Sequence, residues 1–371
     1  AHGDHSRRRL ESTVATDRSV VFVTSSMRLS GGILVLVQYA NGLVDRGYRV
    51  TFVGSGGGVA PEVAQKLSAQ AEVLSAAMTL EEAIGLVGKL RLSWQIARLV
   101  PECETIVATH TPAVVPTLLA QHLLRRTSRA VWFHQDYAEM FRDRPIERWL
   151  LRHAPRWFER VLTVSQACRD EIAQTSGVDA WVIPQGYSIA GGLPERAVPS
   201  AGSKVIMYVG DRRPRKGWDD FFSAAEQVYR SHADLRLTIV TKEPGSIRTT
   251  VPYDLHLRPS WDTMLELYRS CHLFVSASWW EGFGRPPLEA MACGTPVVTT
   301  DSRGVREYAQ DGVNCLMVPI RDPSALATAM DQMLSDPFLA RRLGEAGRQT
   351  AMEFTWERAV TRFVHALKAQ R

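Results

Sequence analysis

Two glutamates that lie close together in the sequence, Glu281 and Glu289, are the residues best placed to do chemistry. Between them stands Gly282-Phe283-Gly284, and the apolar stretch LFVSAS comes shortly before Glu281. We expect LFVSAS to be a buried strand and PLEAMAC to begin a helix. A glycine loop between strand and helix presents unpaired backbone N–H groups to an anion. Two carboxylates beside that anion suit the hydroxyl groups of a sugar, so the run predicts a site for a phosphorylated sugar.

Each glutamate also has a purely structural explanation. Glu281 is able to pair with a helix N-terminus, and Glu289 is able to lie on a solvated helix face where it balances Arg285. The joint occurrence of both glutamates with the glycine loop favours the binding site.

A basic loop follows the apolar run KVIMYV. It contains Arg212, Arg213, Arg215 and Lys216 and is bounded by glycines. Four cations in one loop repel each other unless an anion lies among them, and arginine forks match phosphate oxygens bidentately. In open parallel sheets, ligands bind at the carboxyl ends of strands. The loop therefore predicts a diphosphate site, with a solvated basic loop as the alternative.

Two more strand ends carry candidate residues. Gly31 and Gly32 follow the first apolar run, where a backbone without Cβ atoms is able to approach a phosphate. His134 ends the run RAVWFH and is able to contact a sugar hydroxyl or to assist proton transfer. The alternative for the two glycines is a tight turn that binds no ligand. The alternative for His134 is a structural histidine whose ring is hydrogen-bonded to neighbouring backbone.

The elements that must position these residues alternate between strand and helix patterns. Short apolar runs bounded by turn residues predict strands, and longer amphipathic runs between them predict helices. This order predicts an α/β protein in which two Rossmann-like domains with parallel sheets face a central cleft. We place a disordered tail at residues 1–18, the first domain at 19–187, a linker at 188–203 and the second domain at 204–354.

Composition restricts the class of protein further. The net charge of +5 permits an anionic substrate or a membrane surface but requires neither. Five scattered cysteines without a C-x-x-C pair argue against a disulfide framework and a zinc site, and fit a reducing, cytoplasmic location. No apolar run reaches the roughly 18–20 residues of a membrane span. The absence of a recognition motif disfavours a nucleic-acid partner.

The run EGFGRPPLEAMACGTPVV resembles the signature of the retaining glycosyltransferases of family 4, which share the GT-B fold. The resemblance extends over nearly the whole chain after the tail. It includes the first glycine loop with its helix, RVLTVSQACRDEI, WVIPQGYS, MYVGDRRPRKGWDDFFSAA and GVREYAQDGVNCLMVPIRDPSALATAM. It implies that the last helix, within 355–371, crosses back to the first domain.

The resemblance implies roles for the residues of the second domain. Arg215 and Lys216 would hold the donor diphosphate and stabilise the departing nucleotide. Glu281 would contact the donor sugar, and Glu289 would bind the ribose hydroxyls. The backbone of the loop from Gly282 to Gly284 would lie near sugar and phosphate.

In the first domain, Gly31 and Gly32 would approach the phosphates and His134 would line the sugar pocket. The sequence departs from the family where an arginine often follows Val-Gly, because Asp211 stands there. We expect Arg212 or Arg213 to substitute for that arginine.

We predict transfer of a sugar from a nucleotide-diphosphate donor to an acceptor hydroxyl, with retention at the anomeric carbon. Because no D-x-D motif is present, lysine, arginine and a helix end are expected to replace a metal, and no cofactor is expected. The HQDY segment resembles bacterial surface-polysaccharide enzymes, which favours a glycan or lipid-linked acceptor. Another GT-B enzyme such as a nucleotide-sugar epimerase, and a non-catalytic sugar-nucleotide-binding module, are the alternatives.

A second hypothesis is that the first domain docks on an anionic membrane, at its inner face. Its basis is a group of arginines beside aromatic residues: Arg142, Arg144, Arg148, Arg152, Arg156 and Arg160 with Trp149, Trp157 and Phe158. Pro155 interrupts this stripe, so two ordinary helices with solvated faces are the alternative.

Overall fold

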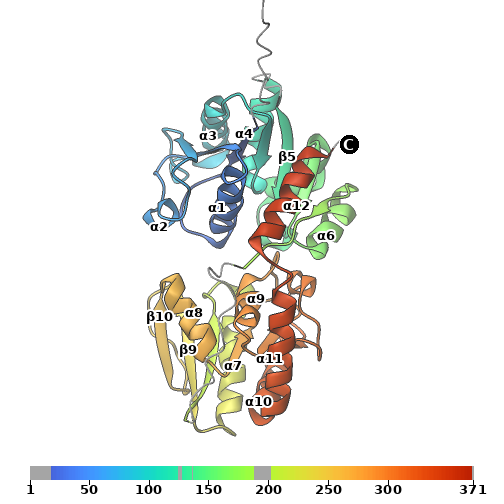
Figure 1. Ribbon diagram of the computed structural model, residues 1–371. Coiled ribbons are helices and arrows are strands. Elements are labelled where there is room, and N and C mark those ends of the chain that lie inside the picture. Colours follow the sequence, from blue (N-terminus) through green and yellow to red (C-terminus); the bar gives the residue numbers. More distant parts are fainter. Residues whose placement is uncertain (1–17, 124–127, 136, 188–201, 370–371) are drawn as a thin grey trace, which may run out of the picture.

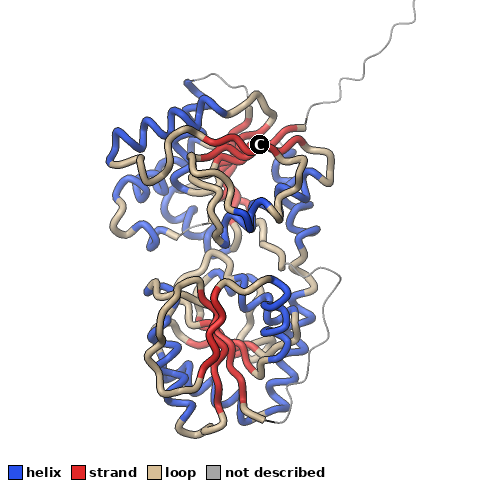
Figure 2. The backbone as a smooth tube through the Cα atoms, turned by 90° about the vertical axis from the view of Figure 1, so that its left-hand side faces the viewer, coloured by secondary structure: helices blue, strands red, loops and turns tan. Residues whose placement is uncertain are grey.

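The computed structural model describes residues 18–123, 128–135, 137–187 and 202–369. They form two α/β lobes, one above the other in Figure 1, each with a sheet in its centre and helices around it (Figure 2). Almost all of the predicted tail and of the predicted linker lies outside the described residues. The exact domain limits therefore stay predictions, whereas the two-domain α/β fold is confirmed.

The first lobe contains a sheet of seven parallel strands in the order β3-β2-β1-β4-β5-β6-β7. β1, β4 and β6 are buried along their whole length, as expected for strands covered on both faces. The strands are β1 (Ser19–Val23), β2 (Arg49–Gly54), β3 (Glu72–Ser75), β4 (Thr105–Ala108), β5 (Arg129–His134), β6 (Arg160–Thr163) and β7 (Trp181–Val182). The helices are α1 (Gly31–Val44), α2 (Pro61–Ala64), α3 (Gly85–Leu99), α4 (Val114–Leu118), α5 (Pro145–His153) and α6 (Gln166–Ser176).

The second lobe contains six parallel strands in the order β10-β9-β8-β11-β12-β13. Its strands are β8 (Lys204–Val209), β9 (Leu235–Thr241), β10 (Tyr253–Leu257), β11 (Leu273–Ser276), β12 (Val297–Thr300) and β13 (Leu316–Val318). Its helices are α7 (Trp218–Tyr229), α8 (Trp261–Ser270), α9 (Arg285–Ala292), α10 (Pro323–Ser335) and α11 (Pro337–Ala351). None of the helices in the described ranges is both long and apolar enough to cross a bilayer.

The last helix, α12 (Trp356–Lys368), lies against the first lobe, beside α1 (Figure 1). Its Phe363 is fully buried, with ring centroids 4.7 Å from Tyr39 and 5.6 Å from Phe133. Arg160 of β6 donates hydrogen bonds to carbonyls at the end of this helix, Ala366 and Ala369. The described part of the chain therefore starts and ends in the same lobe.

Both sheets have a point at which the order of strands reverses. In the first lobe this switch point lies between β1 and β4, and in the second between β8 and β11. The connections that leave the two central strands diverge there, which opens a crevice at their carboxyl ends where ligands of such folds bind. The two switch points therefore identify where to look for chemistry.

Candidate active site

The basic loop and the first glutamate meet at the switch point of the second lobe. Lys216, in the loop after β8, donates from Nζ to Oε1 of Glu281, in the loop after β11, over 2.6 Å. The Arg215 guanidinium lies 3.5 Å from the other carboxylate oxygen. Ser278 donates its hydroxyl to the same Oε1 at 2.8 Å. Residues 65 positions apart in the chain thus form one ionic cluster.

The backbone of the basic loop is held in place by its neighbours. Gly217 has φ of +62°, and a Cβ there would come within 1.9 Å of the Ala277 carbonyl oxygen. Only glycine accepts both conditions. The Tyr208 hydroxyl donates to the Lys216 carbonyl at 2.8 Å, and the Trp279 amide donates to the Arg215 carbonyl at 2.7 Å. The two loops are therefore tied together by backbone as well as by charge.

The cluster fixes the charge of Glu281. Burial alone raises the pKa of the carboxyl, but the charges of Lys216 and Arg215, with the Lys216 and Ser278 hydrogen bonds, outweigh burial and hold the pKa below its usual value. The carboxylate is therefore ionised at neutral pH. A negative side chain and two cations stand side by side, which suits a ligand carrying both hydroxyl groups and phosphates.

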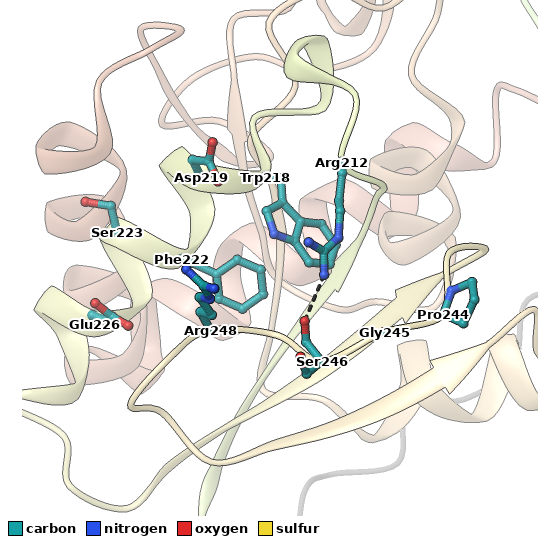
Figure 3. Close-up of a pocket in the computed structure, with 10 residues that line it drawn as sticks. All are labelled: Arg212, Trp218, Asp219, Phe222, Ser223, Glu226, Pro244, Gly245, Ser246 and Arg248. Carbon is teal, nitrogen blue, oxygen red and sulfur yellow. Dashed lines mark hydrogen bonds between the residues drawn. The ribbon is translucent and has the colours of Figure 1, made fainter.

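The other two cations of the loop, Arg212 and Arg213, bind partners other than Glu281. Arg213 forms a two-pronged ion pair with Asp211, at 2.6 and 2.7 Å, and this pairing lowers the pKa of Asp211 to about 2 although its burial acts to raise it. Arg212 reaches over the Trp218 ring and donates to the Ser246 carbonyl at 2.8 Å, in a separate pocket of about 870 Å³ (Figure 3). Three of the four cations thus pair with carboxylates of the same chain, Asp211 and Glu281, while the diphosphate site of this loop stays a prediction.

Arg212 and Arg213 are thus not brought to the ionic cluster in this structure. Their substitution for the missing family arginine stays a prediction without support from the geometry.

Glu289 lies inside the second lobe, on the face of α9 that is buried. It is 5% exposed, receives a hydrogen bond from the Tyr268 hydroxyl at 3.0 Å and pairs with Arg285 at 2.7 Å. The alternative of a solvated helix residue was wrong, although the predicted pairing with Arg285 is found. Both oxygens of this buried carboxylate are engaged, one by Tyr268 and one by Arg285, and its role toward a ribose stays a prediction.

The glycine loop lies where the two lobes touch. A Cβ at Gly282 would stand 2.5 Å from the carbonyl oxygen of Gln135, in the first lobe, so the backbones are in close approach. Gly284 is the N-cap residue that precedes α9 and has φ of +84°, and the Tyr308 hydroxyl donates to its carbonyl. The Phe283 side chain is buried against Tyr308, which leaves only its backbone for a ligand.

In the first lobe, Gly31 and Gly32 form the exposed N-terminus of α1. The Ser30 hydroxyl caps the helix by accepting from the Ile33 amide at 3.2 Å, and no atom lies within 4 Å of a Cβ built on either glycine. His134 differs: its side chain is fully buried at the end of β5, and its ring lies 5.4 Å from the Trp132 ring. The roles of these three residues stay predictions.

A chain of polar residues at the carboxyl edge of the first sheet was missed by the sequence analysis. His110, just after β4, contacts the Ser25 hydroxyl at 2.7 Å and the Thr109 hydroxyl at 2.8 Å. Gln135 continues the chain to Thr109 and to Gln185. Burial lowers the pKa of His110 to about 4, so its imidazole is neutral at neutral pH.

The Ser25–His110 contact joins the loops after β1 and β4, so it spans the switch point of the first lobe. Through Gln135 it borders the glycine loop of the second lobe. The signal that identified His134, a histidine at the carboxyl end of an apolar run, also applies to His110 in TIVATH and would have found it.

Comparisons with known proteins support the glycosyltransferase family that the sequence resembles. The family described as Glycosyltransferase Family 4 matches residues 30–190, and Glycosyl transferases group 1 matches residues 194–350. Among curated relatives, glycogen synthase of Mycobacterium tuberculosis is 29% identical over 231 residues, covering 58% of this chain and 54% of that protein. A D-inositol 3-phosphate glycosyltransferase of Acidothermus cellulolyticus is 31% identical over 176 residues, covering 42% of this chain and 39% of that protein. The alignments thus span about half or less of these relatives.

Solved structures share the fold over almost the whole chain. HepE of Anabaena in complex with UDP and glucose has a TM-score of 0.77 at 20% identity, covering 95% of this chain and all of that one. Sucrose-phosphate synthase of Thermosynechococcus elongatus has a TM-score of 0.76 at 16% identity, covering 94% of this chain and 98% of that one.

The tight approach at Gly217 yields a stability prediction. Gly217→Ala is expected to lower the free energy of unfolding by at least about 2 kcal/mol, because the new Cβ meets the Ala277 carbonyl and the positive φ disfavours an L side chain. Urea denaturation measures the change. Gly31→Ala is the matched control and is expected to change stability by less than about 1 kcal/mol, since its Cβ points into open space. Equal effects of the two substitutions would show that the basic loop is not held as described.

Proposed function

This chain belongs to family 4 of the GT-B glycosyltransferases, and we propose that it transfers a sugar from a nucleotide-diphosphate donor to an acceptor hydroxyl with retention of anomeric configuration. The observation that carries the proposal is the ionic cluster at the switch point of the second lobe. It combines one ionised carboxylate, Glu281, with two cations, Lys216 and Arg215, within hydrogen-bond or ion-pair distance.

The cluster suits the charge that develops during transfer. The bond between the anomeric carbon and the diphosphate oxygen breaks, and the diphosphate keeps the electron pair. The acceptor oxygen then forms a bond to the same carbon, and its proton passes to the departing phosphate. Preplaced cations stabilise the leaving group most where water is excluded. In this proposal Lys216 and Arg215 take the part that a metal plays elsewhere, and Glu281 binds hydroxyls of the sugar.

The donor nucleoside extends toward α9 in this proposal. Glu289, already hydrogen-bonded by Tyr268 inside the lobe, accepts the ribose hydroxyls. The exposed N-terminus of α1, with Gly31 and Gly32, approaches the diphosphate from the first lobe, as helix N-termini suit phosphates. HepE, a structural neighbour solved with UDP and glucose, supports a nucleotide-diphosphate sugar as donor.

We propose further that the polar chain of the first lobe binds the acceptor. Ser25 and His110 offer a hydroxyl and a neutral imidazole, groups that donate to or accept from a hydroxyl without adding charge. The relatives named for glycogen and for inositol 3-phosphate support an acceptor with several hydroxyl groups. A glycan or glycolipid of a bacterial surface, made on the cytoplasmic side, fits this chemistry.

The cluster predicts a loss of turnover when either charge is removed. After a thermal-shift panel of nucleotide sugars identifies the donor, Lys216→Ala and Glu281→Ala are each expected to reduce turnover at least about a hundredfold, because leaving-group or sugar stabilisation is lost. Release of free nucleoside diphosphate in the presence of a chelator measures the rate. Arg212→Ala is the matched control from the same loop and is expected to lose less than about tenfold, since it binds the Ser246 carbonyl instead.

Near-normal turnover of a folded Lys216→Ala or Glu281→Ala protein would contradict the proposal. The same assay separates the rival functions. An epimerase converts the donor sugar without an acceptor, and a binding module shifts in melting temperature with the donor but releases no nucleotide.

The acceptor side makes a separate prediction. His110→Ala and Ser25→Ala are expected to lower kcat/KM for the acceptor about tenfold or more while the Kd of the donor stays unchanged, because one hydrogen-bond partner of the acceptor is removed. Initial rates at varied acceptor concentration, with donor binding by calorimetry, provide the two numbers. His122→Ala, an exposed histidine of the same lobe, serves as control. A weaker donor Kd with unchanged acceptor dependence would place the pair on the donor side instead.

A further inference from the structure

Exposed apolar side chains are concentrated in one part of the first lobe. Among the described residues, sixteen large apolar side chains are exposed, and nine of them fall in two segments, 84–98 and 140–157. The nine are Ile84, Leu86, Val87, Leu90, Trp94, Met140, Ile146, Trp149 and Trp157. These two segments are a small fraction of the chain. Exposed apolar side chains scattered singly over the surface would not gather there in this way. We name these residues and the cations beside them the basic-apolar surface.

The first segment consists mainly of α3, which has an apolar stripe turned away from its own lobe. Ile84 and Val87 are 82% and 80% exposed, and Leu86, Leu90 and Trp94 follow at helical spacing on the outside. The opposite face, with Leu92 and Ile96, is buried in the core. Figure 1 shows α3 at the side of the first lobe that lies away from the second lobe.

The second segment adds tryptophans and arginines. The exposed rings of Trp149, in α5, and Trp157, in the turn after it, lie with centroids 5.6 Å apart. The structure corrects the group predicted from sequence, because Phe158 and Arg160 are buried. Arg160 holds the end of α12 instead of facing solvent.

An ion pair joins the two segments. Lys89 of α3 lies 3.6 Å from the carboxylate of Glu147 in α5. The ion pair therefore places α3 next to α5, the helix that contains Trp149.

The net positive charge of the chain comes from these two segments. The two segments contain eight lysines and arginines, all exposed, and two acids. The eight are Lys89, Arg91, Arg98, Arg142, Arg144, Arg148, Arg152 and Arg156. The rest of the chain has 36 cations and 37 acids, so the surplus of +5 arises entirely here.

We propose that the basic-apolar surface docks the first lobe on an anionic lipid bilayer. Apolar side chains gain free energy by entering the acyl boundary, tryptophan rings suit the interfacial region, and arginines extend to the headgroups. Each cation near an anionic membrane adds about 1 kcal/mol of attraction. The proposal does not depend on the transfer reaction.

Charge favours lipid over a second copy of the chain as the partner. Two copies that meet through this surface bring a surplus of six positive charges against another six, and like charges across an interface are unfavourable. An anionic bilayer compensates the same charges and accepts the apolar stripe at once. Its attraction must weaken with salt, because exposed charges are screened.

Cosedimentation of the full chain with vesicles tests the proposal. The chain is expected to bind vesicles that contain phosphatidylglycerol, to bind pure phosphatidylcholine at least about tenfold more weakly, and to be released by salt. The double variant Arg148→Glu with Arg152→Glu is expected to weaken binding on the order of tenfold for each reversal. Val87→Ser is expected to weaken it several-fold through lost apolar contact.

Matched controls come from the second lobe. Arg230→Glu with Arg248→Glu reverses two exposed arginines there, and Phe338→Ser removes an exposed ring that is 66% accessible. Both controls are expected to bind vesicles like the unaltered chain. Equal loss in test and control variants, binding that ignores phosphatidylglycerol, or a stable dimer that Val87→Ser dissociates while vesicles stay unbound, would each overturn the proposal.

Discussion

The contact between Lys216 and Glu281 is the interaction on which the candidate site depends. It joins the loops that leave β8 and β11, the two central strands of the second sheet, at the point where the connections diverge. Without Lys216, the largely buried carboxylate of Glu281 would keep only one cation nearby, Arg215, which is farther away at 3.5 Å. A buried charge with too few partners destabilises the folded state, because its lost hydration is not compensated. The pair therefore orders both loops and at the same time concentrates charge where a ligand must bind.

Neighbouring residues hold the two loops in the positions that this contact requires. The glycine at 217 lets the basic loop turn against β11, and the Tyr208 hydroxyl holds the carbonyl of the lysine itself. The first lobe meets the loop after β11 through Gln135, which is linked through Thr109 to the hydrogen-bonded pair of Ser25 and His110. Each sheet thus carries one short polar contact at its switch point, charged in the second lobe and neutral in the first. This asymmetry is the basis for the proposed charged donor in the second lobe and the proposed neutral hydroxyl acceptor in the first.

Local patterns predicted most of the fold, because the hydrophobic periodicity of a strand or helix and the glycines that bound it are visible within a short segment of sequence. The runs around β8, β11 and α9 were placed correctly, and with them Glu281, Lys216 and Arg215. The partners of charges were not predictable, since they depend on side-chain direction: Arg213 turns to Asp211 and Arg212 to the Ser246 carbonyl. α3 was missed because its glycines and outward apolar residues obscure the usual amphipathic pattern. α11 and β3 were also missed; β3 is short and only half-buried.

The central claim is that Lys216 and Arg215 bind the diphosphate of a donor, and calorimetry on a nucleotide pair tests it most directly. UDP and UMP, or the guanosine pair if the panel favours it, differ by one phosphate and nothing else. The account predicts that the unaltered chain binds the diphosphate about tenfold or more tightly than the monophosphate, and that Lys216→Ala removes most of this difference while the monophosphate Kd stays the same. A Lys216→Ala protein that still discriminates as the unaltered chain does would contradict it.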